Sequence, residues 1–281
     1  MILIADSGST KTHWKVINVD KSIETIYTRG LNPYFTDEGI FHTVLNSELV
    51  LCKNEVQEVH FYGSGCGTKE KILLVKKYLK SCFTSAEINV YSDLLGAARA
   101  LLGRDKGIAC ILGTGSVSCI YDGKEIKSTT PSLGFILGDE GGGAMLGKEL
   151  LRAYFYNKLP ENIKNAFIKN FKITREEVLD KVYRQPSPNA YLASFSKFIR
   201  TCYHDPFIHD MVYNCFKDFF NNHVMVYPEY KKLPLVFTGS VSANLKEILE
   251  EVAGEFGIKI SKIMKEPMDG LVEFHRNTNI D

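Results

Sequence analysis

Short apolar segments that alternate with glycine turns set the pattern of this 281-residue chain. The pattern is most complete in the stretch 89–118. Apolar residues recur at helical spacing over 94–102 and predict a helix, and the apolar run 108–112 predicts a strand. Asp93 stands just before the helix, and a Gly-Thr-Gly-Ser turn at 113–116 follows the strand. This segment therefore offers a carboxylate at a strand–helix junction and a glycine hairpin whose backbone N–H groups suit a phosphate.

The N-terminal segment repeats the strand–turn–strand arrangement. An apolar strand at 2–6 leads through Ser-Gly-Ser-Thr at 7–10 into a strand at 12–19. The turn resembles a P-loop superficially, but the full GxxxxGK[ST] pattern is absent, and a strand rather than a helix follows it. A glycine hairpin still presents N–H donors and a hydroxyl to an anion. Two such hairpins and a carboxylate are parts that phosphoryl transfer requires.

Beyond these segments, the chain reads as two copies of one mixed α/β unit, the second enlarged by a helical insertion at 144–226. We expect two lobes, 1–104 and 105–265, each with its own sheet. The last helix, 266–281, is expected as an additional element that can pack back on the first lobe. Seven aromatic residues of the insertion are predicted to be core rather than a cofactor site: Tyr191, Phe195, Phe198, Tyr203, Phe216, Phe219 and Phe220. The other expected strands are 24–28, 56–62, 87–91, 117–121, 125–128, 233–237 and 258–263, and the other expected helices are 37–51, 69–80, 144–156 and 243–256.

Composition indicates a globular protein that binds neither nucleic acid nor a membrane. An apolar content of 44% suffices for a sizeable core, and the net charge of +1 comes from interspersed charges without a basic stripe. No apolar run reaches membrane-spanning length, and Met1–Ala5 runs into Asp6 without the features of a signal peptide. The seven cysteines form no CxxC pair. This favours buried thiols in a reduced, cytoplasmic protein over a disulfide scaffold, a metal site or an iron–sulfur site.

Each candidate residue also has a purely structural explanation. An Asp before a helix is first of all an N-cap, worth about 1 kcal/mol, so Asp93 taken alone favours capping. A Gly-Thr-Gly-Ser turn taken alone favours a simple hairpin. The dense glycines around Asp139 and Glu140 suit either a plain loop or a close approach of backbone to a ligand. The second copy of the hairpin shifts the interpretation toward function, and capping and catalysis at Asp93 can coexist.

In their order along the chain, these motifs resemble the actin/Hsp70/sugar-kinase superfold. Within it they are similar to the N-acetylglucosamine kinase group and its BadF/BadG/BcrA/BcrD ATPase relatives, over nearly the whole chain. The resemblance implies a two-lobed, actin-like (ribonuclease H-like) α/β fold, a homodimer, and use of ATP with Mg²⁺. The matching motifs are Asp6-Ser7-Gly8-Ser9-Thr10 and 113–116 for two phosphate loops, Gly239-Ser240-Val241 for an adenosine loop, and the family-specific Gly138-Asp139-Glu140-Gly141.

The resemblance also implies a role for each matching position. Asp93 matches the general base, and Asp6 matches the acid that holds Mg²⁺ through water. At Gly115 we expect a phosphate to approach the backbone, where a side chain would obstruct it. The implied ATP-binding positions are Gly8, Ser9, Thr10, Lys11, Gly113, Thr114, Gly115, Gly239, Ser240 and Val241, and the implied sugar-binding positions are Asn32, Asp93, Ser116, Gly134 and Asp139.

We interpret the chain as an ATP-dependent kinase that phosphorylates an amino sugar. The family resemblance implies that the 6-hydroxyl of the sugar is the acceptor. Two departures leave the sugar open, because Leu133 stands where members often carry Trp and Val117 where some carry Asn. N-acetylglucosamine, glucosamine and N-acetylmuramic acid all remain candidates. One alternative is an ATPase that couples hydrolysis to a partner protein, although the GGQD-type signature of the iron–sulfur activators is absent. The other is a sugar-sensing binding protein, against which the presence of Asp93 and Asp6 argues.

Overall fold

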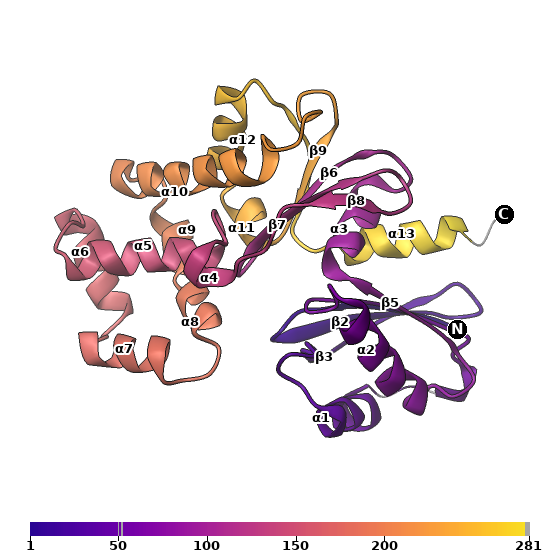
Figure 1. Ribbon diagram of the computed structural model, residues 1–281. Helices are drawn as coiled ribbons and strands as arrows, with labels where there is room; N and C mark the ends of the chain where they lie inside the picture. The colour runs from indigo at the N-terminus through magenta and orange to yellow at the C-terminus, as the bar shows by residue number, and fades with distance from the viewer. Residues whose placement is uncertain (50, 52, 279–281) are drawn as a thin grey trace. The chain divides into compact units, whose positions relative to one another are not determined.

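The chain of the computed structural model divides into two compact units (Figure 1). The first unit combines Met1–Arg104 with the C-terminal segment Pro267–Asp281, and the second unit is Asp105–Glu266. Among the described helices, none has the length and apolar character that a membrane span requires. The residues that the structure describes are 1–49, 51 and 53–278.

Each unit is built on its own five-stranded sheet, and the two sheets share one strand order. The central strand pairs antiparallel with its hairpin partner on one side and parallel with a later strand on the other. The predicted duplication in an α/β fold is therefore confirmed. The order in the first unit is β3 (Ile23–Arg29), β2 (Lys11–Ile17), β1 (Ile2–Ser7), β4 (Glu58–Gly63), β5 (Glu87–Ser92). The matching order in the second unit is β8 (Ile126–Thr129), β7 (Ser116–Tyr121), β6 (Gly107–Leu112), β9 (Leu235–Thr238), β10 (Ile260–Met264).

Helices cover both faces of the first sheet because successive side chains of its strands point to opposite faces. On β1, Leu3 and Ala5 belong to one apolar core, whereas Ile4 between them belongs to another. Both cores exclude water, so the first four residues of the strand, Ile2–Ala5, are apolar without alternation. The helices are α1 (Glu38–Thr43) and α2 (Lys69–Cys82) on the first face, and α3 (Asp93–Leu102) and α13 (Met268–Thr278) on the second.

Two predicted helices are divided in the structure. The helix expected at 37–51 ends early, and a π-helical turn, η1 (Val44–Glu48), and a 3₁₀ turn, η2 (Lys53–Glu55), follow it; residue 50 lies outside the described part. The helix expected at 243–256 consists of α11 (Ser240–Asn244) and α12 (Lys246–Glu255). Leu245 separates these two with φ −119° and ψ 32°, and its side chain is buried. Packing of Leu245 into the core accompanies a break that apolar periodicity does not reveal.

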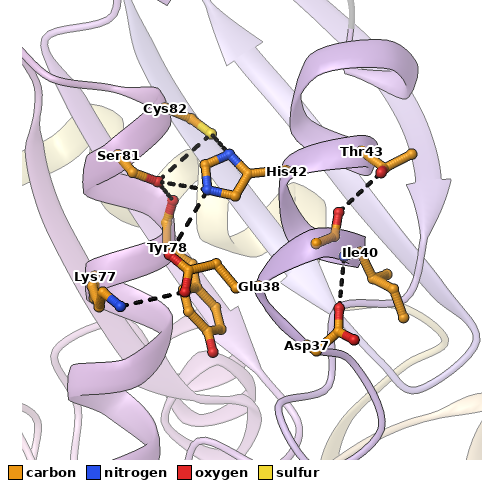
Figure 2. Close-up of polar contacts among 10 residues, drawn as sticks. Asp37, Glu38, Ile40, His42, Thr43, Lys77, Tyr78, Ser81 and Cys82 are labelled. Carbon is orange, nitrogen blue, oxygen red and sulfur yellow. Dashed lines mark hydrogen bonds and ion pairs between the residues drawn. The ribbon is translucent and has the colours of Figure 1, made fainter.

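Polar contacts join α1 to α2 at the surface of the first core, as Figure 2 shows. Lys77 Nζ lies 3.3 Å from Glu38 Oε2, and the His42 ring lies within 3.5 Å of Ser81 Oγ and Cys82 Sγ. Exposed pairs of this kind contribute little to stability. The apolar contact beneath them therefore provides most of the attachment of α1 to α2.

The cysteines carry no disulfide among the described residues. Burial raises the pKa of the Cys119 and Cys215 thiols to about 12, which keeps them protonated and unreactive. This agrees with the prediction of buried thiols at four positions and differs at two, where the thiol is half-buried. The buried ones are Cys66, Cys110, Cys119 and Cys215, the half-buried ones are Cys82 and Cys202, and Cys52 lies outside the described residues.

The helical insertion of the second unit forms a group of helices at the left of Figure 1. The seven aromatic residues predicted as core belong to the core: Phe195, Phe198, Phe216, Phe219 and Phe220 are buried, and Tyr191 and Tyr203 are partly buried. Tyr156 and Tyr183 of the same insertion are exposed. The sequence pattern missed the single turn α4. The elements are α4 (Gly134–Leu137), α5 (Gly143–Phe155), α6 (Glu161–Asn170), α7 (Arg175–Tyr183), α8 (Pro188–Ser194), α9 (Ser196–Cys202), α10 (Pro206–Phe219) and a π-helical turn, η3 (Phe220–Val224).

A buried polar cluster attaches α13 to the first unit. His275 Nε2 lies 2.9 Å from Tyr62 Oη, and Arg99 Nη1 donates to the same hydroxyl at 2.9 Å. The rings of His275 and His60 are 3.9 Å apart. Burial, followed by the nearby His60 and Arg99, lowers the pKa of His275 to about 3, so this imidazole is neutral in the folded protein. An added Cβ at Gly270 would lie 2.3 Å from the Ala100 backbone oxygen, so α13 and α3 are in close contact.

Acid should weaken this attachment. The pKa of His275 falls from 6.5 to about 3 on folding, so its stabilising effect is complete above pH 6.5 and is lost as the pH falls toward 3. At pH 5 the loss from one such group is about 2 kcal/mol. Urea unfolding at pH 7.5 and pH 5 should therefore show a smaller pH-dependent loss of stability in His275→Gln than in the wild type. His204→Gln, at an exposed position, is the control; an equal loss in His275→Gln would contradict the assignment.

Candidate active site

The β1–β2 hairpin is held at its base by buried hydroxyl groups. Ser7 Oγ and Thr12 Oγ1 lie 2.7 Å apart, and Ser7 Oγ accepts the Leu31 backbone N–H at 3.0 Å. Gly8 closes the turn by donating its N–H to the Lys11 backbone oxygen at 3.0 Å. The residues exposed beyond this base, where a ligand can reach them, are Ser9, Thr10 and Lys11.

Asn32 connects the loop after β3 to two other candidate loops. Its Nδ2 donates to Ser9 Oγ at 2.9 Å and to Ser64 Oγ at 3.3 Å, while its Oδ1 accepts the Tyr34 N–H at 3.0 Å. A Cβ at Gly65 would lie 2.5 Å from that Oδ1. The structure thus brings predicted Asn32 and Ser9 together. Ser64 was not predicted, although the glycine-rich end of its strand was the signal that could have revealed it.

Asp6 lies near the end of β1 and is partly exposed. Mg²⁺ is commonly bound by one or two carboxylates, with water and substrate phosphates completing the octahedron. Within the described part of the chain, no three acidic, histidine or cysteine side chains gather into a metal cage. A single carboxylate beside a glycine hairpin fits an ion that is held mainly by water and substrate.

Asp93 is the first residue of α3 and is not its N-cap, so the capping explanation for this residue is wrong. Ser92 is the cap: its Oγ accepts the Leu95 N–H at 3.2 Å, and its backbone is extended. Asp93 Oδ1 instead accepts the N–H of Leu94 at 2.8 Å. Because an Asp and a Ser both suit a helix start, the sequence alone did not distinguish the two positions.

The surroundings of Asp93 favour its protonated form. Burial raises the pKa of the carboxyl above its ordinary value, and the Leu94 N–H only partly opposes this. The neighbouring Cys66 thiol has a pKa of about 12, raised first by burial and then by Asp93. A carboxylate with a raised pKa binds a proton more readily, which suits a general base.

The second glycine hairpin, between β6 and β7, rests on the start of α5. The backbone oxygens of Gly113 and Thr114 accept the N–H groups of Gly143 and Ala144 at 2.8 and 2.9 Å. These contacts satisfy two donors that the first turn of a helix would otherwise leave unpaired. They also fix the position of the hairpin, whose Thr114 side chain is exposed.

The segment Gly138–Gly141 packs on the same hairpin. Asp139 Oδ1 accepts the Ser116 N–H at 3.2 Å. A Cβ at Gly115 would lie 2.7 Å from the Asp139 carboxylate, and one at Gly142 would lie 2.8 Å from the Gly115 backbone. Gly115 is therefore required by Asp139 within the protein itself, a reason beyond the phosphate approach that we expected.

Ser116 and Asp139 together form the most ligand-like feature of the second unit. Ser116 is buried, and its Oγ has no hydrogen-bond partner among the described residues. Buried hydroxyls are nearly always paired, so an unpaired one beside a carboxylate suggests a ligand. Burial raises the pKa of Asp139, partly opposed by the Ser116 N–H. The predicted Gly134 begins α4, the turn that leads to Asp139, with φ 71°.

The predicted adenosine loop packs directly on the second hairpin. Gly239 has φ 120°, and a Cβ there would lie 2.1 Å from the Leu112 backbone oxygen and 3.2 Å from Gly113 N. The structure therefore brings two of the three predicted nucleotide loops together. Ser240 is exposed, whereas the Val241 side chain is buried in the core, so only its backbone is available to a nucleotide.

Comparison with known proteins agrees with an actin-like sugar-kinase fold. One similar solved structure is a candidate N-acetylglucosamine kinase from Porphyromonas gingivalis, which is 40% identical in sequence. The alignment covers 100% of this chain and 100% of that chain, with a TM-score of 0.95. Another candidate N-acetylglucosamine kinase, from Chromobacterium violaceum, shares the fold at 16% sequence identity. The alignment covers 97% of this chain and 98% of that chain, with a TM-score of 0.75.

Sequence comparison leads in the same direction. An N-acetylmuramic acid/N-acetylglucosamine kinase from Clostridium acetobutylicum is 24% identical over 213 residues, which are 70% of this chain and 69% of that protein. No protein-family model matches the chain. The fold and the ordered glycine loops define a sugar kinase of the actin-like class. From its identity to the Porphyromonas protein over the whole length, the chain belongs to the N-acetylglucosamine kinase family.

The second hairpin can be tested at Gly113 more cleanly than at Gly115. An added Cβ at Gly113 meets no atom within 4 Å. Gly113→Ala should therefore fold normally yet lower ATP affinity by about tenfold or more, because the methyl group occupies the space that a phosphate needs. Calorimetric titration with ATP and a thermal melt measure the two effects. Gly254→Ala, where a Cβ also meets nothing, is the control; unchanged ATP affinity in folded Gly113→Ala would reject the hairpin as a phosphate site.

Proposed function

We propose that the protein transfers the γ-phosphate of ATP to the 6-hydroxyl of an amino sugar such as N-acetylglucosamine. Asp93 carries the proposal: it is a carboxylate at the end of a strand, at the first residue of a helix, with a pKa raised by burial. The membership of the N-acetylglucosamine kinase family supports the choice of substrate class. N-acetylmuramic acid enters the panel because the Clostridium relative is named for both sugars.

The reaction divides among the candidate residues as follows. Asp93 accepts the proton of the sugar hydroxyl as that oxygen bonds to the γ-phosphorus, and the bond from phosphorus to the ADP oxygen breaks. The Gly8 and Gly113 hairpins supply backbone N–H and hydroxyl groups to the phosphates. Bound Mg²⁺, held by Asp6 through water, would offset phosphate charge. The Ser116 hydroxyl donates to a sugar oxygen, which would satisfy the unpaired Ser116 Oγ, and the Asp139 carboxylate accepts from a sugar hydroxyl.

The homodimer remains a prediction from the family resemblance, and the cytoplasmic location remains a prediction from the cysteines. Sedimentation of the purified protein would give the oligomeric state. A coupled ADP-release assay across amino sugars would give the acceptor. Release of ADP at the same rate without any sugar would favour the ATPase interpretation instead.

Asp93→Asn tests the base directly. Asn keeps the size and can still accept the Leu94 N–H, but it cannot take a proton from a hydroxyl. Sugar-dependent turnover should fall by at least ~10²-fold, with ATP affinity and thermal stability near wild type. Ser92→Ala is the matched control, since losing the cap should cost about 1 kcal/mol of stability without removing the base. Turnover at the parental rate in folded Asp93→Asn would place the base elsewhere, with Asp139 next to be tested.

The pH dependence of sugar phosphorylation provides a separate test. A general base must be ionised, so kcat/KM should fall on the acid side as Asp93 becomes protonated. Because burial raises its pKa, this fall should be centred above 3.8, the ordinary value for aspartate. Rates measured in overlapping buffers, alongside a check that the protein stays folded, would show it. A profile flat down to pH 4 in folded protein would argue against Asp93.

A further inference from the structure

Glu140 follows Asp139 in the chain but has a different set of partners. Its Oε2 lies 3.0 Å from His223 Nε2, and its Oε1 accepts from Asn222 Nδ2 at 3.2 Å. Burial alone would raise the pKa of this carboxyl, but the bonds from His223 and Asn222 lower it below its ordinary value. Of two adjacent acids in one loop, Asp139 therefore contacts the hairpin and Glu140 is held by η3.

His223 continues the chain of contacts into the core of the second unit. Its Nδ1 lies 2.6 Å from Thr130 Oγ1, just after β8. Ser118 Oγ on β7 lies 2.5 Å from the His223 backbone oxygen and 2.9 Å from Tyr227 Oη. The His223 side chain is only 6% exposed, so these partners replace water completely. The loop after α4 is thereby connected to Thr130 through the His223 imidazole and to β7 through the His223 backbone oxygen.

The protons of this network can be assigned from the partners. Nε2 of His223 faces a carboxylate and so carries a proton, while Thr130 can donate its hydroxyl proton to Nδ1. Thr130 Oγ1 also lies 3.3 Å from Ser118 Oγ. The network is therefore a continuous connection of hydrogen-bonded groups from Glu140 to Ser118.

Packing also holds the imidazole in place. The rings of His223 and Phe219 are stacked, with 4.9 Å between centroids and 14° between planes. Phe219 also touches the loop, since a Cβ at Gly141 would lie 3.1 Å from Phe219 Cβ. The π-helical turn η3 begins directly after Phe219 and carries His223. Such turns occur often at functional sites, because the extra residue redirects side chains.

Asp139 needs this support because its backbone is strained. It has φ 61°, the left-handed region that costs a non-glycine residue free energy. Its carboxylate makes one backbone hydrogen bond, to the Ser116 N–H. A strained residue with one hydrogen bond keeps its geometry only if the neighbouring structure imposes it. Glu140, through His223 and Asn222, and Gly142, through its close approach to the Gly115 backbone, hold the chain on either side of Asp139 and so constrain its backbone.

We propose that Glu140, His223 and Thr130 are positioning residues that fix the Asp139 carboxylate in its sugar-binding geometry. The inference rests on the proposed function, in which Asp139 binds sugar. None of the three touches substrate in this scheme. Displacing a contact group by about 1 Å can cost up to about 10²-fold in rate, so loss of the network should act on sugar binding and leave the nucleotide loops unaffected.

His223→Phe is the main test variant. Phe keeps the stack on Phe219 but lacks both ring nitrogens, so Glu140 loses its buried partner. We expect the KM and Kd for N-acetylglucosamine to rise about 10-fold to 100-fold, with the Kd for ATP within about twofold of wild type. His223→Gln, whose amide can donate to Glu140, should restore part of the affinity. Glu140→Gln tests the same contact from the other side should His223→Phe fold poorly.

A matched control lies on α10, where His209 Nε2 contacts Glu251 Oε2 at 2.9 Å on the surface. His209→Phe removes a histidine–carboxylate pair of the same kind far along the helix from η3, and it should leave both affinities unchanged. An equal loss of sugar affinity in His209→Phe would mean that any change in this helix disturbs the site, which would overturn the positioning role.

A double-mutant cycle decides whether the network acts through Asp139. In an Asp139→Asn background, His223→Phe should cost less than about threefold in sugar Kd, because the group being positioned has already lost its charge. Full additivity, or unchanged sugar affinity in folded His223→Phe, would overturn the inference alone. Failure of the wild type to bind or phosphorylate any amino sugar would overturn the proposed function, and this inference with it.

Discussion

Direct contact between backbones at the ends of β-strands holds both glycine hairpins in place. A Cβ at Gly30 would lie 2.4 Å from the Gly8 backbone oxygen, and one at Gly239 would lie 2.1 Å from the Leu112 backbone oxygen. Such spacing excludes every side chain, so only glycine permits it. Each hairpin rests on a neighbouring loop of its own unit, which keeps its N–H donors in position before any ligand binds. Preformed donors of this kind cost little reorganisation during a reaction.

Three carboxylates of the proposed site differ in what the protein does to them. Burial raises the pKa of Asp93 and of Asp139, and hydrogen bonds from His223 and Asn222 lower that of Glu140. The two raised ones carry proposed chemical roles, and the lowered one is a structural anchor. Residues with raised pKa reduce stability at neutral pH, since the fold favours their protonated forms there.

The C-terminal helix shows how the chain completes its first unit. His275 and Tyr62 come from opposite ends of the sequence, and the close contact at Gly270 leaves no room for a larger residue. α13 shares its core with α3, the helix that begins with Asp93. The last segment of the chain therefore supports the helix on which the proposed base lies, a reason for it to return to the first unit.

How much the sequence determines differs from feature to feature. Alternating apolar runs and glycine turns were enough to predict two mixed sheets, the two hairpins and the junction at Asp93, because these signals are local. The resemblance to a kinase family supplied the candidate roles. Local signals did not separate Ser92 from Asp93 as the cap, and they did not reveal the break at Leu245.

Only the tertiary structure decided which distant residues meet. Asp139 reaches the Ser116 N–H across 23 residues, and His223 reaches Glu140 across 83. No periodicity links such positions, since the contacts depend on how the insertion folds back on β7 and β8. The buried side chain of Val241 and the unpaired hydroxyl of Ser116 likewise follow from packing. Sequence thus determined which groups are candidates for the chemistry, and packing over long separations determined which of them are held together.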